Sequence, residues 1–203
     1  MFRKIIYSIL IGALTLISTK STADEVRYQY DENFPAGSFS LANFRASLRG
    51  LSVLSGNAQV FHQVQAHHLK GHGVSRQFYK SIVADNAKAG FESLVSVEKG
   101  AAGSDSKQLN KNLILSATAQ AYSRPELRIS TDDVSCAHGS ATGELSEVEL
   151  FYLQSRGIAR ENARFMMIEG FAEEILEDVS YAPLKKRLME TVQKKIEEIC
   201  HPE

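Results

Sequence analysis

Cysteine is scarce in this chain, and its scarcity limits the sites that the chain can build alone. The 203 residues include two cysteines, Cys136 and Cys200. Two cysteines are too few for the disulfide framework of a small secreted domain, and these two form neither a CxxC pair nor a four-ligand zinc spacing. A metal site that used either of them would have to recruit histidines or carboxylates.

Positive charge is not in excess either. The formal net charge is −1, and no long run of Lys and Arg is present. Nucleic-acid-binding domains usually carry a basic patch, because they neutralise phosphates. The sequence also lacks a P-loop, a GxSxG motif and a dinucleotide-binding fingerprint. Nucleic acid is therefore not an expected partner, and these three enzyme classes have no support.

The longest apolar run stands at the amino terminus. Arg3 and Lys4 precede an apolar stretch from Ile5 to Ile17, and small residues follow up to Ala23. This order is typical of a secretory signal peptide, and the run is short for a membrane span. The alternative interpretation is a buried strand pair or helix. Residues 1–25 are thus set apart as a hydrophobic, signal-like segment.

Amphipathic helix patterns are missing between about Asn57 and Ile129, which argues against a βαβ domain. The sequence there alternates in short stretches such as AQVFHQVQ, AGFESLVSVE and LNKNLILSA. Clusters of Gly, Ser, Asn and Asp separate these stretches, as expected for short strands joined by turns. Strands at such intervals suit a β-sandwich or a β-helix, and periodicity does not distinguish the two.

The period changes after Gly143, where three helices are predicted. Ser146 and Glu149 have the spacing of a capping box, and Gly157 is a natural residue just past a helix end. Two more helices are expected, from Arg160 and after Pro183. Their apolar stripes are Phe165, Ile168, Ala172 and Ile175 in the first, and Leu184, Leu188, Val192 and Ile196 in the second.

Cys136 and His138 form the most suggestive pair of side chains. If residues 134–138 are extended, both point to one face with their Cα atoms roughly 6.5–7 Å apart. That separation suits two ligands of one metal centre better than a nucleophile and its base. Thiolate and imidazole are acceptable to iron–sulfur clusters or zinc, but a complete site needs further ligands from elsewhere. The alternative is a small buried cysteine beside a histidine in a turn.

A second group, in AHHLKGHG, contains His67, His68 and His72. On a helix, His68 and His72 would share a face in the manner of metal-binding pairs. Gly71 and Gly73 argue against a helix at this point. A structural or hydrogen-bonding role is therefore expected for these histidines in place of a metal site.

Five segments carry a resemblance to a known family: SRQFYK, SKQLNKNLILS, RPELRISTDDVSCAHG, ELFYLQSRGI and GFAEEILEDV. In this order, from about Asn57 to Val179, they resemble the carboxyl-terminal half of the SufB/SufD family. Its members are subunits of the SUF iron–sulfur cluster assembly complex. The Cys-Ala-His-Gly at 136–139 is similar to the SufD branch, since SufB-like chains lack the cysteine at this point.

The resemblance implies a fold and a role. The fold would be a truncated right-handed parallel β-helix over residues 26–143, followed by a small helical domain over residues 144–203. The role would be that of a SufD-like, non-enzymatic scaffold subunit of the SufBCD complex. Such a subunit pairs with a SufB-type paralogue and docks a SufC-type ATPase, and a transient iron–sulfur cluster is shared at the subunit interface. The SUF machinery implies a cytoplasmic location, against the export that residues 1–23 suggest.

The resemblance also assigns residues. Cys136 and His138 match the family's candidate cluster ligands. The surface that contacts the SufC-type ATPase would include Phe151, Tyr152, Arg156 and Phe171. The histidines that match family positions without an assigned role are His62, His68 and His72.

The chain departs from the family pattern in several places. Family members are about twice as long, so the first turn of the β-helix would have an open edge that residues 1–25 could cap. The usual His-Gly-Ala-Thr-Val-Gly reads His-Gly-Ser-Ala-Thr-Gly at 138–143, which is expected to alter a turn after the ligands. Ala159 stands where a polar N-cap is usual. The alternative function is therefore an exported or degenerate β-rich protein that keeps the fold without the assembly role. An enzyme using Cys136 as nucleophile ranks last.

Overall fold

A computed structural model describes the backbone of four strands between residues 4 and 40, and residues 45–177 and 179–200 with their side chains. The strands are β1 (Lys4–Leu10), β2 (Ala13–Lys20), β3 (Glu25–Tyr30), β4 (Gly37–Ser40), β5 (Arg45–Leu54), β6 (Gln59–His68), β7 (Val74–Val83), β8 (Lys88–Val97), β9 (Ser104–Ile114), β10 (Gln120–Ile129) and β11 (Val134–Glu144). The helices are α1 (Glu147–Ser155), α2 (Arg160–Leu176) and α3 (Ala182–Cys200).

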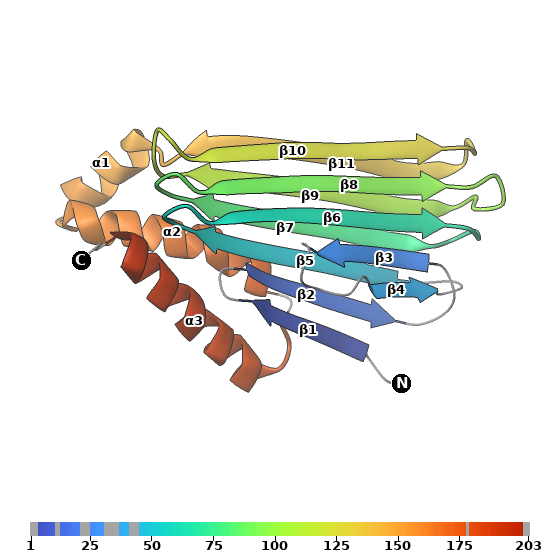
Figure 1. The fold of residues 1–203 in the computed structure, drawn as a ribbon, viewed down its shortest axis with the longest axis horizontal. Helices are drawn as coiled ribbons and strands as arrows, with labels where there is room; N and C mark the ends of the chain where they lie inside the picture. Colours follow the sequence, from blue (N-terminus) through green and yellow to red (C-terminus); the bar gives the residue numbers. More distant parts are fainter. Residues whose placement is uncertain are drawn as a thin grey trace.

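Strands β5 to β11 build a parallel β-helix (Figure 1). Successive strands alternate between two sheets, so that β5, β7, β9 and β11 are neighbours in one sheet and β6, β8 and β10 in the other. All pairs among these seven strands are parallel. Three turns, β5–β6, β7–β8 and β9–β10, are complete, and β11 begins a fourth. The predicted β-helix followed by helices is confirmed, and the sandwich, whose sheets are antiparallel, is excluded.

The turns between strands stack as regularly as the strands do. Asp85 lies in a turn with φ 55°, and its carboxylate accepts a hydrogen bond from the Gly56 N–H of the turn below at 2.7 Å. The Asp85 N–H donates to Ser116 Oγ of the turn above at 2.8 Å. Aspartate tolerates this left-handed conformation better than most residues. Asp85 thus ties three successive turns together, through its side chain on one side and its backbone N–H on the other.

The edge of the first turn is covered by strands from the amino-terminal part of the chain. β2 pairs with β5 and β3 pairs with β6, and both pairings are antiparallel. The backbone groups that β5 and β6 would otherwise leave unpaired are therefore met by other strands. None of the helices in the described part of the chain has the length and apolarity that a membrane span requires.

α1 and α2 begin where the sequence predicts, and α3 begins at Ala182, one residue before Pro183. Ser146 caps α1, its side chain accepting from the Glu149 N–H at 3.3 Å, and Gly157 follows the helix with φ 87°. The cap of α2 is Ala159, which offers no side-chain acceptor. α2 and α3 turn their apolar stripes onto the outer face of the sheet that contains β5, β7 and β9. One buried cluster joins them: Leu51, Val53, Ile82, Leu113, Ile168, Ala172, Ile175, Leu176, Leu188, Val192 and Ile196.

We expect Ala159→Ser to stabilise the chain by about 1 kcal/mol, because a hydroxyl there can accept from a free N–H in the first turn of α2. The backbone of Ala159 already has the extended conformation of a capping residue, with ψ 144°. Thermal unfolding should show a melting temperature higher by about 2–4 °C. Ala159→Val, which adds bulk without an acceptor, is the control. Equal gains in both variants would contradict the capping explanation.

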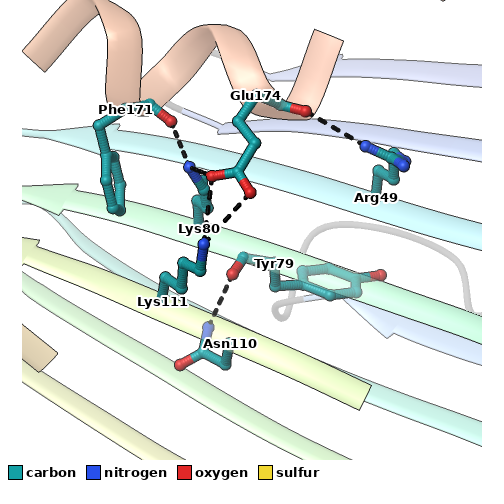
Figure 2. A network of polar contacts seen from close by, with 7 residues as sticks. All are labelled: Arg49, Tyr79, Lys80, Asn110, Lys111, Phe171 and Glu174. Atoms are coloured by element: carbon teal, nitrogen blue, oxygen red, sulfur yellow. Dashed lines mark hydrogen bonds and ion pairs between the residues drawn. The ribbon is translucent and has the colours of Figure 1, made fainter. Parts of the chain in front are cut away.

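A cluster of charges fastens α2 to the sheet (Figure 2). The Lys80 side chain is only 1% exposed, and its Nζ donates to the Glu174 carboxylate and to the Phe171 carbonyl. Lys111 Nζ lies 3.2 Å from Glu174 Oε1, and Arg49 donates to the Glu174 carbonyl at 3.2 Å. α2 has no basic residue in its last turn. Cations from β5, β7 and β9 therefore meet its negative end instead.

Candidate functional site

One inward-facing row of side chains is buried on β9 but mostly exposed on β11, the last strand of the β-helix. On β9, the inward-facing residues Ser106, Gln108, Asn110 and Asn112 are at most 4% exposed. Their partners in register on β11 are Cys136, His138, Ser140 and Thr142. Of these four, Cys136 is half-buried and the other three are exposed. The same inward face is thus covered on β9 and open on β11.

Cys136 and His138 share this face, as their spacing predicts. Cys136 packs against an apolar cluster of Ala66, Val95, Val97 and Ala101. Burial raises the pKa of its thiol, and a hydrogen bond with the Ser106 backbone acts in the opposite direction. An activated nucleophilic cysteine has a lowered pKa. The surroundings of Cys136 therefore do not activate it as a nucleophile, and a metal ion that bound it would have to displace the proton.

A thiol and an imidazole on one open face fit two positions of an iron–sulfur or metal site. Among the residues with described side chains, no three or more His, Cys, Asp or Glu come together in a way that could hold a metal ion. Within that part of the chain, Cys136 and His138 therefore offer half of a site at most. Further ligands would have to approach from the open side of β11.

The turn expected at Gly139–Gly143 is wrong. These residues continue β11 as far as Glu144, in parallel register with Leu109 to Ile114 of β9. The neighbouring strand holds them extended, since each residue has a partner in the ladder. The altered family motif therefore changes which side chains lie on the two faces of β11. The residues that follow His138 belong to this strand and not to a loop.

Inside the β-helix, polar side chains of successive strands form chains of hydrogen bonds, here called polar ladders. His68 Nε2 lies 2.9 Å from Ser75 Oγ, which lies 2.7 Å from Ser106 Oγ. Asn112 Nδ2 donates to Asn110 Oδ1 at 2.9 Å and to Thr142 Oγ1 at 3.0 Å. Buried polar groups need such partners. The second ladder links the buried interior directly to the open row on β11.

A separate surface lies on α1. Val148, Phe151 and Tyr152 are 78%, 72% and 56% exposed, while Leu150 is buried and anchors the helix. The guanidinium carbon of Arg156 lies 5.6 Å from the centre of the Tyr152 ring. Exposed apolar side chains gathered at i, i+3 and i+4 commonly mark a binding surface. Val148 was missed by sequence reasoning, although its spacing from Phe151 and Tyr152 carried the signal.

Phe171 does not join the α1 surface. It belongs to α2, is half-buried against the shared core, and its ring lies 4.0 Å from Lys80 Nζ. The structure therefore brings Phe151, Tyr152 and Arg156 together and places Phe171 at the junction of α2 with the sheet.

The comparison with known proteins covers the whole β-helix. Residues 34–171, more than half of the chain, match the family model described as SUF system FeS cluster assembly, SufBD core domain. The chain belongs to the SufBD family. This core domain includes all seven strands of the β-helix and both Cys136 and His138.

Several relatives are similar over about 60–70% of the chain. A SufBD family iron–sulfur cluster assembly protein of Synechocystis is 41% identical over 121 residues, which are 60% of this chain and 27% of the relative. Escherichia coli SufD is 36% identical over 129 residues, 64% of this chain and 30% of that protein. Plasmodium falciparum SufD is 33% identical over 146 residues, 71% of this chain and 10% of that protein. The chain thus spans less than a third of each of these SufBD relatives.

The histidines without an assigned role in the SufBD pattern prove to be placed differently. His62 lies in the interior with Nε2 2.8 Å from Ser52 Oγ, and His68 is buried beside Ser75. Burial lowers the pKa of both His62 and His68 to about 4, so both are neutral near pH 7. His72 is exposed in a turn with φ 63°. His62 and His68 thus have the hydrogen-bonded placement of structural residues.

Proposed function

We propose that this chain is a SufD-like, non-enzymatic scaffold subunit in iron–sulfur cluster assembly. Membership of the SufBD family supports the general role. The observation that carries the proposal is the open row on β11, where a thiol and an imidazole lie uncovered on the inward-facing side of the last strand. The cluster is the cargo of this site, and Cys136 and His138 supply two of its ligands.

A SufB-type paralogue would complete the site. In the described part of the chain, β10 pairs only with β8 and β11 only with β9, so both are edge strands. Edge strands present unpaired N–H and C=O groups, to which strands of another chain can add. A partner that pairs there covers His138, Ser140 and Thr142, and brings its own ligands to Cys136 and His138.

A SufC-type ATPase would dock on α1. Val148, Phe151 and Tyr152 form the most exposed apolar surface on the described helices, and aromatic residues contribute strongly to binding energy at interfaces. The role also implies the cytoplasm, because free thiols stay reduced there and the ATPase has its nucleotide. Amino-terminal sequencing of the protein recovered from fractionated cells tests this location.

Co-purification tests the proposal as a whole. The tagged chain should retain a SufB-type and a SufC-type protein from extracts of its own cell. A chain that binds neither, and that is recovered outside the cytoplasm with a processed amino terminus, would support the exported or degenerate alternative instead.

Phe151→Asp should weaken binding of the SufC-type ATPase at least tenfold, because it places a charge in the centre of the apolar surface on α1. Binding to the SufB-type partner should not change, since β10 and β11 are untouched. Titration with each purified partner measures both affinities. Tyr181→Asp is the matched control, because Tyr181 is 63% exposed but lies between α2 and α3. A similar loss in both variants would contradict docking on α1.

A further inference from the structure

A third polar ladder ends beside His138 and has a consistent direction. Gln108 Nε2 donates to Ser93 Oγ at 2.5 Å, and the Ser93 hydroxyl donates to Gln77 Oε1. Both glutamines are almost fully buried, at 1% and 2% exposure, and lie in register on β7 and β9. Both hydrogen bonds of this ladder therefore run from Gln108 towards Gln77, whose own Nε2 is a buried donor with no hydrogen bond in the described part of the chain.

The upper end of the ladder is an acceptor without a partner. Gln108 Oε1 is buried and has no hydrogen bond within the part of the chain that the structure describes. The oxygen and nitrogen of an amide diverge from its carbon, so an amide whose nitrogen faces Ser93 turns its oxygen away from Ser93. A buried acceptor without a partner has lost its hydrogen bonds to water and gained none in return, which is unfavourable. The Gln108 side-chain oxygen can therefore accept a hydrogen bond from a donor that approaches it.

On the side of β9 that faces away from Gln77, His138 is the residue in register with Gln108. It pairs with Gln108 across β9 and β11, on the same inward row. Neighbouring strands lie about 4.8 Å apart, so a side-chain rotation brings an imidazole N–H within reach of an amide oxygen on the adjacent strand. The His138 side chain is exposed on β11.

We propose that Gln108 is the positioning residue for His138. One imidazole N–H donates to Gln108 Oε1, which leaves the other ring nitrogen unprotonated and turned towards the open side of β11. Ligating histidines commonly fix their tautomer by such a bond from the second nitrogen. Aligned donors polarise one another, so the bonds through Ser93 to Gln77 strengthen the Gln108 oxygen as an acceptor. The purpose of this arrangement, holding a ligand for a cluster, rests on the proposed function.

Nuclear magnetic resonance of the isolated chain tests this contact. With 15N-labelled histidine in alkaline buffer, His138 should show a single neutral tautomer and an imidazole N–H that exchanges slowly with water. Gln108→Met, similar in volume and without a strong acceptor, should return His138 to a mixture of tautomers and abolish the slow N–H. A mixture of tautomers in the unmodified chain would overturn the proposal. So would an imidazole nitrogen that accepts from Gln108, the result of the reversed amide orientation.

The control is Asn112→Leu, which removes a buried amide from the same strand but belongs to the ladder that ends at Thr142. It should leave the His138 tautomer unchanged, and an equal effect of both variants would refute a specific role for Gln108. The spectrum of the unmodified chain decides the question even if Gln108→Met does not fold. No partner is needed, so a negative co-purification and a failure of this contact are separate results.

Discussion

Glu174→Met is expected to lower the free energy of unfolding by about 2 kcal/mol. Its carboxylate is the counter-ion of Lys80, whose side chain is 1% exposed and 94 residues away in sequence. Removing one member of a buried pair leaves the other charge uncompensated, at a typical cost of about 3–5 kcal/mol. The expected value is smaller because the Glu174 side chain is 40% exposed and water screens it. Urea unfolding should show a lower midpoint with an unchanged slope.

The same variant should change the response to acid. Desolvation acts to raise the pKa of Glu174, but hydrogen bonds and charges from Lys80 and Lys111 outweigh it, and the pKa lies below the ordinary value of 4.5. A carboxylate with a lowered pKa contributes stability that is fully present above about pH 4.5 and is lost as the pH falls through the lowered value. The difference in stability between the two proteins should therefore shrink below about pH 4.5.

Two further variants separate the ion pair from other effects. Glu173→Gln removes an exposed carboxylate one residue earlier on α2 and should change stability by less than about 0.5 kcal/mol. Lys80→Met combined with Glu174→Met should recover much of the loss, because apolar replacement of a whole buried pair is often neutral. If the double variant were less stable than Glu174→Met, the uncompensated charge of Lys80 would not be the cause.

The sequence revealed the strands with clear alternation and the helices with clear caps, but not every element of the β-helix. β5 was hidden among the turn signals of residues 24–56, because it is buried on both faces near its end and contains Gly50. That glycine is needed where it stands, since the Tyr79 ring occupies the space of a Cβ. Alternation alone is the same in a sandwich and a β-helix, so the resemblance to a family was required to choose between them.

The sequence predicted which residues of the site share a face, but not how deeply they are buried. Alternation along a strand places Cys136 and His138 on one face, but burial depends on the strand that lies opposite, which no local pattern specifies. The turn predicted at Gly139–Gly143 failed for a related reason: small residues suggest a turn, and the pairing with β9 overrides them. The contacts of Lys80 with Glu174, and of Gln108 with Ser93, join segments that only the three-dimensional fold brings together.

Cys136→Ala and His138→Ala should each reduce cluster assembly at least tenfold without weakening the binding of either partner. Loss of a supporting residue alone typically costs ten- to a hundredfold at metal sites, and these side chains are proposed as the ligands themselves. Partner binding should survive, because β11 is held by its ladder to β9, and neither alanine disturbs that backbone. The measurements are the visible absorbance of the cluster on the purified complex and the recovery of an iron–sulfur enzyme that receives it.

Ser140→Ala is the matched control, since Ser140 occupies the next position of the same open row and carries no metal-binding group. It should leave assembly unchanged. Phe151→Asp should show the opposite pattern, with ATPase binding lost and both ligands in place. If Cys136→Ala still supported full cluster assembly, the thiol would not be a ligand of the cluster. The open row would then be only a contact surface for the partner.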